Sequence, residues 1–343
     1  MKTYEFILKP LSGFGTPLKG DTIFGQFCWQ LLENEYKIGK SLDHLLSAYD
    51  REPFIVFSSA VPRYKSKGKY HYAFRFPTVP KHLTKFITEN EEKGILKKKN
   101  IFLSVQEGDK FPDLKRLHED NIIANEIEID DENIGSFASK IEINYTQWHN
   151  TIDRRYWRTT GDRFAPFAKE QIVHHPGIEL SLFIGVEEDI ISIEKVKDIL
   201  SDIGRIGFGR DASTGLGKFK ILSYKEKDLF NFGNEPYNAC YTLAPCLPEK
   251  NTIDKTKSYF STFIRYGRHG NTLARSSNPF KNPVVMISEG AVITPLDKES
   301  FKIPYIGKAI YNVSKVEPKT VVQGYSLYIP VNLEDNQYVN AKI

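Results

Sequence analysis

The chain has 343 residues, of which 40% are hydrophobic and 26% are charged, and its formal net charge at pH 7 is +4. This length is enough for two domains, since about 100 to 200 residues per domain are usual. The three cysteines include no CxxC pair, which argues against a disulfide framework and a zinc site, so we expect a cytoplasmic protein. We also expect neither a signal peptide nor a membrane span, because no apolar run approaches the roughly 18 residues that a span needs.

The first predicted elements are a strand and a helix. Apolar residues alternate with others along residues 3–10, which predicts a strand. Apolar residues at helical spacing over residues 23–32 predict a helix, with Asp21 as its expected N-cap residue. Two further strands are predicted at residues 54–59 and 70–76, joined through a basic turn.

A second group of elements is predicted farther along the chain. Residues 179–186 indicate a strand. Apolar residues at helical spacing indicate a helix over residues 193–203, with Ser192 as its N-cap residue. A glycine-rich loop follows at residues 204–219, and a strand begins at Phe219.

These elements predict an α+β fold. The first group and the second group together give the order β-α-β-β, a long insertion at about residues 79–176, and then β-α-β, which is close to that of a ferredoxin-like (RRM-like) domain. Later, an alternating run ends in Leu243-x-Pro245, as the first strand ends in Leu8-x-Pro10. We therefore expect tandem ferredoxin-like domains at residues 1–235 and 236–343, the second being a degenerate copy of the first.

The loop at residues 204–219 contains five glycines. Glycine is used where the backbone takes a positive φ or approaches a ligand closely. Successive amides beside Arg210, Lys218 and the hydroxyls of Ser213 and Thr214 suit a phosphate-bearing partner, because such amides form an anion-binding concavity. The spacing fits neither GxxxxGK(S/T) nor GxGxxG, and a strand follows instead of a helix, so we expect no nucleotide cofactor. The alternative is an elaborate helix C-cap and turn.

Residues 150–164 are rich in arginine and are predicted to form a protruding hairpin, because residues 159–162 resemble a turn. Guanidinium groups bind phosphates in a bidentate manner, and aromatic rings stack on unpaired bases for ~1–3 kcal/mol each. The alternative is a hairpin held by Arg–Asp pairs, with Trp157 as a core anchor. The segment contains Arg154, Arg155, Arg158 and Arg163, interleaved with Tyr156, Trp157 and Phe164.

Charge is distributed unevenly along the chain. Residues 53–88 contain seven bases and no acid, residues 255–288 contain six bases and no acid, and acids gather at residues 119–132. Such segregation steers a polyanion to one face of a protein. Ordinary solvated faces produce the same pattern, so the role of the two basic runs is open.

Three separated blocks together resemble the RAMP superfamily of CRISPR-associated proteins. They are GFGTPLKGDTIFGQ at residues 13–26, N-x-I-x-R followed by RTTG at residues 150–161, and GFGRDASTGLGKF at residues 207–219. The first block is similar to that of the Cas-five-like Csm-four family, whose members are subunits of type III-A CRISPR–Cas (Csm) effector complexes. The length of the chain also fits that family.

The resemblance implies tandem ferredoxin-like domains and a non-catalytic, RNA-binding structural subunit in antiviral defence. Such a subunit caps the repeat-derived 5′ tag of the CRISPR RNA (crRNA) and joins the large polymerase-type subunit to the adjacent backbone RAMP subunit, and no cofactor or metal is implied. By this resemblance, RNA contacts come from Gly207, Gly209, Arg210, Ser213, Thr214, Gly215, Gly217 and Lys218 of the loop, from Arg154, Arg155, Arg158 and Arg163 of the hairpin, and from Lys19, with Asp21 nearby mainly as a cap.

Two other functions are open, a metal-independent CRISPR RNA-processing endoribonuclease and a generic single-stranded RNA-binding module. The endoribonuclease needs a histidine as general acid or base, for which His149 and His175 are the candidates. No histidine lies in the N-terminal loop, and the acids at residues 126–132 are expected to be solvated, so we expect a protein that is not an enzyme. His174 and His175 precede a strand and are expected to satisfy local hydrogen bonds.

Overall fold

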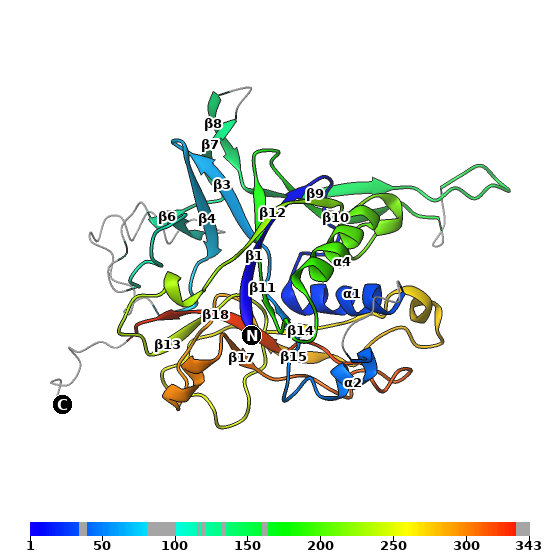
Figure 1. Cartoon of the computed structure of the whole chain (residues 1–343). Helices are drawn as coiled ribbons and strands as arrows, with labels where there is room; N and C mark the ends of the chain where they lie inside the picture. The colour runs from blue at the N-terminus through cyan, green and yellow to red at the C-terminus, as the bar shows by residue number, and fades with distance from the viewer. Residues whose placement is uncertain are drawn as a thin grey trace, which may run out of the picture.

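The computed structural model describes residues 1–33, 40–80, 101–114, 117, 121–131, 135–159 and 164–333 (Figure 1). The protein has a mixed α and β structure with mostly antiparallel sheets and few helices. Within these ranges, no helix combines the length and the apolar character that crossing a membrane requires.

A large antiparallel sheet dominates the first part of the chain. Its strand order is β12-β1-β11-β3-β4-β5-β6, and β2 also pairs with β11. The strands are β1 (Lys2–Pro10), β2 (Ile55–Phe57), β3 (Val61–Ser66), β4 (Lys69–Arg75), β5 (Phe102–Gln106), β6 (Ile122–Ile123), β11 (Glu179–Val186) and β12 (Phe219–Glu226).

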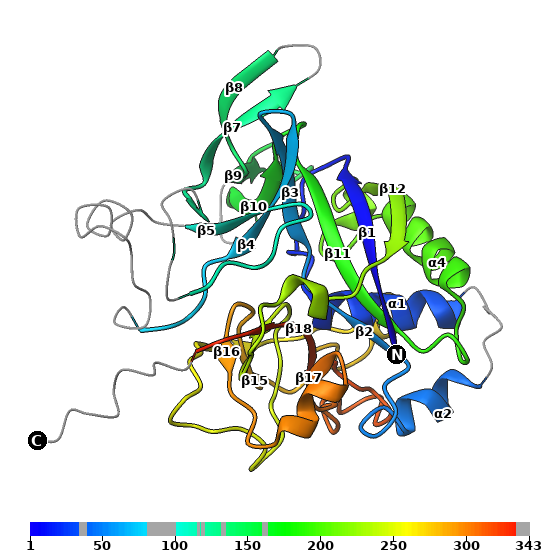
Figure 2. The same cartoon turned by 60° about the vertical axis from the view of Figure 1, so that its left-hand side comes forward.

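Two longer helices lie beside this sheet and contact one another, α1 (Gly20–Glu33) and α4 (Ile193–Ile206), as Figures 1 and 2 show. The short helix α2 (Leu42–Ser47) contacts α1. The chain therefore runs β1, α1, β2, β3 and β4, and after the insertion β11, α4 and β12, which is the predicted order of strands and helices with β3 as an additional strand. Strand β11 pairs with β1 along its length.

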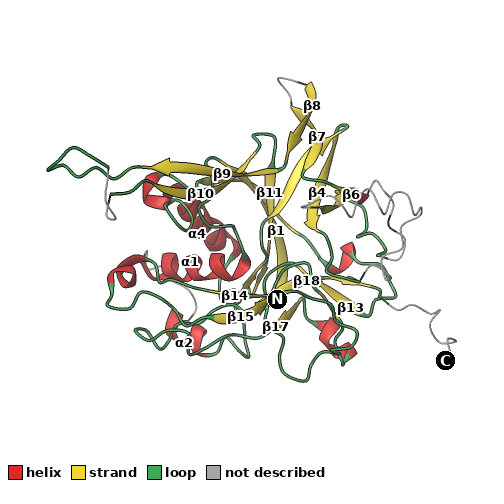
Figure 3. Cartoon of the chain, turned by 180° about the vertical axis from the view of Figure 1, so that it is seen from behind, coloured by secondary structure: helices red, strands yellow, loops and turns green. Residues whose placement is uncertain are grey.

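The predicted insertion contributes both to the sheet and to two hairpins. Strands β5 and β6 extend the large sheet next to β4. The hairpins are β7 (Glu126–Asp131) with β8 (Gly135–Lys140), and β9 (Glu142–His149) with β10 (Phe167–His174). The β9–β10 hairpin extends away from the body of the molecule in Figures 1 and 3.

The second part of the chain contains a four-stranded antiparallel sheet in the order β16-β13-β18-β17 and a separate pair, β14-β15. The described residues from 236 to 333 contain 3-10 helices and no α-helix, so a second ferredoxin-like copy stays a prediction. The strands are β13 (Ala239–Thr242), β14 (Thr262–Arg265), β15 (Val284–Ile287), β16 (Val292–Ile293), β17 (Tyr305–Gly307) and β18 (Tyr325–Val331).

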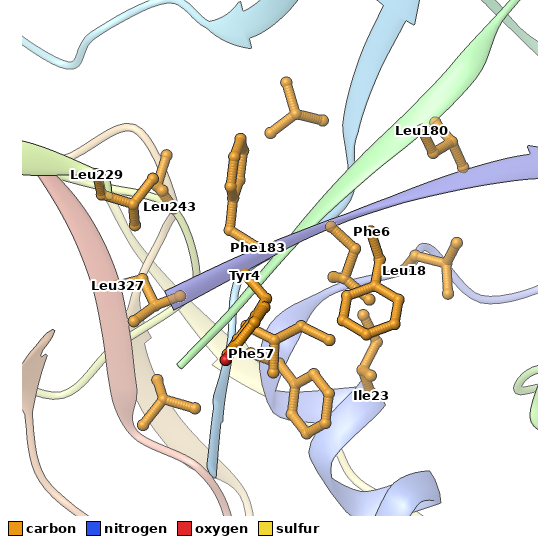
Figure 4. Packing of buried hydrophobic residues seen from close by; sticks show 14 of the residues in the cluster. Tyr4, Phe6, Leu18, Ile23, Phe57, Leu180, Phe183, Leu229, Leu243 and Leu327 are labelled. Atoms are coloured by element: carbon orange, nitrogen blue, oxygen red, sulfur yellow. The ribbon is translucent and has the colours of Figure 1, made fainter. Parts of the chain in front are cut away.

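One hydrophobic core connects the two parts. Phe6 and Phe183 of the large sheet and Ile23 of α1 belong to the same buried cluster as Leu243 and Leu327 of the second part (Figure 4). Burying such apolar side chains is the main favourable contribution to folding. The core thus continues across residue 236, and the domain boundary there stays a prediction.

The structure agrees with several local predictions and corrects two. Ser192 is the N-cap residue of α4, and its hydroxyl accepts a hydrogen bond from the Lys195 amide. The basic turn predicted between residues 59 and 70 is wrong, because residues 61–66 form β3 and the turn is limited to Lys67 and Gly68. Helix α1 begins at Gly20, so Asp21 lies inside its first turn.

Candidate RNA-binding surface

The glycine-rich loop begins where α4 ends. The amide of Gly207 donates to the Ile203 carbonyl (2.8 Å), and Gly207 takes a φ of 115°. A single 3-10 turn follows at Ala212–Thr214. Gly209, Gly215 and Gly217 also have positive φ values, of 73°, 98° and 74°, which glycine adopts without steric cost. The loop is therefore partly the elaborate helix C-cap and turn that the sequence left open.

Most backbone amides of this loop bind acceptors within the protein. The Phe208 amide donates to Gly217 O (2.9 Å), and the Gly217 amide donates to Gly13 O (2.7 Å). The Arg210 amide donates to Thr16 Oγ1 (3.0 Å). In all, the amides of residues 207–210 and 214–218 have such partners. The expected phosphate-binding concavity is therefore wrong for these amides, because their acceptors lie in α4, within the loop itself or in the N-terminal segment.

Three of the glycines are required by packing. A Cβ atom on Gly207 would lie 2.5 Å from Leu216 O, one on Gly209 would lie 2.6 Å from Thr16 Cβ, and one on Gly217 would lie 2.2 Å from Phe208 O. Gly215 differs, since no atom lies within 4 Å of the position of its Cβ. Of the four predicted loop glycines, Gly215 alone leaves room for a ligand to approach its backbone.

The polar side chains of the loop face outward. Arg210, Ser213, Thr214 and Lys218 are exposed. The Arg210 guanidinium donates to the Glu170 carbonyl of β10 and lies 3.4 Å from Asp211 Oδ2. Asp211 also accepts from Lys169 Nζ of β10 (2.6 Å). The loop therefore presents exposed basic and hydroxyl side chains in place of free amides.

The arginine-rich segment forms the end of the β9–β10 hairpin, as predicted. Within its turn, the Asp153 amide donates to Arg158 O (3.0 Å), and Arg155 Nε lies 3.7 Å from Asp153 Oδ1. Trp157 is 82% exposed, so the alternative that placed it in the core is wrong. Arg154, Arg155 and Arg158 are also exposed, whereas Arg163 lies outside the described residues.

The tertiary structure brings the loop and the hairpin together. Phe14 and Ile172 of β10 exchange backbone hydrogen bonds of 2.8 and 2.9 Å, next to the contacts that Arg210 and Asp211 make with β10. The block at residues 13–26, the hairpin and the loop therefore meet at the base of the hairpin. The arginine-rich residues that the sequence singled out lie at the opposite, far end of the same hairpin. Only the fold shows that residues 13–26, the loop and β10 are neighbours.

Lys19 and Asp21 are engaged with residues of the second part. Lys19 Nζ lies 3.0 and 3.1 Å from the two carboxylate oxygens of Glu289. Asp21 is buried, its carboxylate accepts a hydrogen bond from Arg265 Nη2 (3.0 Å), and Arg265 Nε lies 2.7 Å from its other oxygen. Burial raises the pKa of the Asp21 carboxyl, and the charge of Arg265 opposes this shift. Asp21 is therefore half of a buried ion pair and not the N-cap residue that was expected.

A cavity of about 290 Å³ lies beside these groups. Its walls come from residues 14–19, from the base of the hairpin at Glu142, Ile172 and His174, and from Glu289. Burial lowers the pKa of His174 to about 4, and its Nδ1 atom has no hydrogen-bond partner among the described residues. The expectation of local hydrogen bonds is thus wrong for His174, but it holds for His175, whose Nδ1 accepts from the Gly177 amide (3.0 Å).

Sequence reasoning missed Glu142, His174 and Glu289 as parts of this site. Glu142 and His174 lie on paired strands that no local pattern connects. In the part of the chain that the structure describes, no group of three or more His, Cys, Asp or Glu side chains is arranged to hold a metal ion.

No protein-family model matches the sequence, and neither does any curated protein. Solved structures do match it from end to end. A chain of the Csm3-Csm4 subcomplex in the type III-A CRISPR-Cas interference complex is 16% identical, with 97% of this chain and 100% of that chain covered and a TM-score of 0.56. A chain of the Csm1-Csm4 cassette in complex with pppApA is 14% identical, with 98% and 99% covered and a TM-score of 0.54.

The Csm1-Csm4 cassette in complex with AMPPNP gives a similar result, with 14% identity, coverage of 97% and 98% and a TM-score of 0.53. At these identities the likeness establishes the fold. The chain therefore has, over its whole length, the fold of a component of type III-A CRISPR assemblies.

Proposed function

We propose that this protein is an RNA-binding subunit of a type III-A CRISPR effector complex that corresponds to Csm4. The observation that carries the proposal is the end-to-end likeness to chains of both a Csm1-Csm4 and a Csm3-Csm4 assembly, since Csm4 is the component that these assemblies share. Two of the sequence blocks that resemble the same family, residues 13–26 and 207–219, meet beside β10, and the hairpin of β10 carries the third block at its far end, which supports the same conclusion.

In this proposal the subunit caps the 5′ tag of the crRNA. Exposed Arg210 and Lys218 of the loop and the exposed arginines of the hairpin contact RNA phosphates, because guanidinium groups bind phosphate oxygens through paired hydrogen bonds. The subunit also joins the large subunit to the adjacent backbone subunit in the cytoplasm, using two ferredoxin-like domains. Lys19 forms an ion pair with Glu289 that already neutralises its charge, so in this proposal Lys19 does not itself contact an RNA phosphate.

The proposed role is structural and not catalytic. The Nδ1 atom of His175 already accepts a local hydrogen bond, and the His149 ring stacks on Phe167 at 5.4 Å, so neither is arranged as a free general base. Incubation with repeat RNA in the presence of a chelator tests this point. Specific cleavage that disappears in His149→Ala or His175→Ala would favour the endoribonuclease instead.

Co-expression with candidate large and backbone subunits from the same genome tests the assembly. We expect one stable particle that contains all three proteins and a short RNA with a fixed 5′ end. The same particle reconstituted with a scrambled 5′ tag should bind that RNA more weakly at physiological ionic strength. If the scrambled tag binds equally well, the protein does not recognise the 5′ tag, and the generic single-stranded RNA-binding module is the better description of its function.

A further inference from the structure

The cavity at the base of the hairpin lies directly behind the surface assigned to RNA. Phe14 and Pro17 line it, and Thr16 between them accepts from the amide of Arg210. Ile172, on the opposite wall, belongs to the strand whose Glu170 carbonyl binds the Arg210 guanidinium. A phosphate held by Arg210 would therefore lie close to the cavity.

The walls of the cavity are largely aromatic and aliphatic. Phe14, Phe74, Phe102 and Tyr241 line it together with Ile172. The volume of about 290 Å³ is at the lower end of the range of ~300–1,000 Å³ that small-ligand sites occupy. Flat aromatic surfaces bind unpaired nucleobases by stacking, so the shape and the chemistry suit one planar base.

Two polar side chains at the base of the hairpin face one another across paired strands, because Glu142 and His174 are register partners in β9 and β10. Glu142 Oε2 lies 4.0 Å from His174 Nε2, which is too long for a hydrogen bond, and the His174 side chain is only 9% exposed. The Nδ1 atom of His174 is buried without a partner among the described residues. This nitrogen is closed off from the cavity, whereas the Glu142 side chain is 35% exposed, so Glu142 is the polar group of the pair that a ligand can contact.

We infer that this cavity receives one unpaired RNA base that carries an exocyclic amino group. The inference rests on the proposed RNA-binding function and adds the chemical class of the ligand. The amino group donates to the Glu142 carboxyl, which lies beside the buried ring of His174. Adenine, cytosine and guanine carry such an amino group, whereas uracil has none and offers only its ring N–H as a donor to the carboxyl.

The charged side chains around the cavity suit a neutral nucleobase inside it and a phosphate group outside it. Glu289 holds both Lys19 (3.0 Å) and Arg75 (3.3 Å) at the wall, so these two cations are already paired. Arg210 of the loop is exposed, although it too lies 3.4 Å from a carboxylate, that of Asp211. The backbone of Glu142 is fixed by Asn125, whose side chain binds both its amide (3.1 Å) and its carbonyl (2.8 Å), which keeps the carboxyl group in position.

Fluorescence anisotropy with the purified full chain and two labelled RNA octamers tests the inference. One octamer contains adenosine throughout, and the other contains purine riboside, which has the same ring system without the amino group. We expect the adenosine octamer to bind about tenfold more tightly, since one good base contact discriminates by ~1–3 kcal/mol. Glu142→Ala should abolish this preference, and Glu142→Gln, which keeps an acceptor oxygen, should retain most of it.

Glu170→Ala is the matched control, because it removes an exposed carboxylate from the neighbouring strand without touching the cavity. It should leave the preference unchanged. Equal affinity of the wild-type protein for both octamers, or a preference that survives Glu142→Ala, would overturn the base site and leave the proposed function intact. Failure to bind either octamer would overturn the RNA-binding function and the base site with it.

Discussion

Replacing Gly217 by alanine tests whether the glycines of the loop serve packing. A Cβ atom at this position would lie 2.2 Å from the carbonyl oxygen and 2.4 Å from the amide nitrogen of Phe208. Ordinary van der Waals contact begins at 3.4 Å, so the two backbone segments would have to separate by roughly 1 Å, the difference between 3.4 and 2.2 Å. The variant therefore perturbs the junction between the loop and the N-terminal segment.

The expected loss of stability has two sources. An L-residue in the left-handed region costs about 1–2 kcal/mol. Separation of the segments also weakens the hydrogen bond from Phe208 N to Gly217 O (2.9 Å) and the one from Gly217 N to Gly13 O (2.7 Å), each worth about 0.5–1.5 kcal/mol. We expect Gly217→Ala to lower the free energy of unfolding by about 3 kcal/mol.

Gly215→Ala provides the matched control. Gly215 also has a positive φ, of 98°, but its Cβ would meet no atom within 4 Å, so only the conformational cost of about 1–2 kcal/mol applies. Urea denaturation measures both variants, and hydrogen exchange at the Gly217 amide reports the local opening. Equal destabilisation by the two substitutions would refute the packing explanation.

Arg210→Ala should weaken RNA binding and reduce the magnitude of the log–log salt slope by about 0.7, because one single-strand phosphate contact is lost. Arg205→Ala, which removes an exposed arginine that pairs with Asp202 one turn before the loop, should change neither, and an unchanged slope in Arg210→Ala would contradict the phosphate contact. Arg265→Ala should destabilise the protein by about 3–5 kcal/mol at pH 7, because it leaves the buried Asp21 carboxylate unpaired. The loss should shrink at lower pH, where a carboxyl with a raised pKa takes up a proton, whereas the exposed Arg268→Ala should have little effect, and equal urea midpoints for the two variants would count against the pair. Burial lowers the pKa of His174 from 6.5 to about 4, so the unfolded chain binds this proton first as the pH falls, and stability is lost between those two values. Lowering the pH from 7 to 5 should therefore cost the wild type about 2 kcal/mol more than His174→Asn, and identical pH profiles would show that His174 is not buried in its neutral form.

Local patterns were sufficient for the elements with strong periodicity. The alternation of β1, the apolar run of β11 and the helical spacing of α4 with its Ser192 cap each depend on near neighbours, and each matches the structure. The turn-like composition of residues 150–164 likewise predicted a protruding hairpin with exposed arginines. Strand β3 was missed because its basic residues resemble a turn, although pairing with β11 and β4 makes it a strand.

The sequence by itself thus determined the order of most strands and helices on either side of the insertion, the positive-φ loop after α4 and the arginine-rich hairpin, because neighbouring residues carry those signals. The ion-pair partners, hydrogen-bond acceptors and burial of the polar groups were decided only by the tertiary structure. Lys19 meets Glu289 across 270 positions and Arg265 meets Asp21 across 244 positions. Several loop amides find their acceptors in the N-terminal segment, and His174 becomes a buried, neutral ring at the wall of a cavity. Ion pairing, hydrogen-bond partners and burial depend on which distant segments the fold brings together, and local spacing does not specify them.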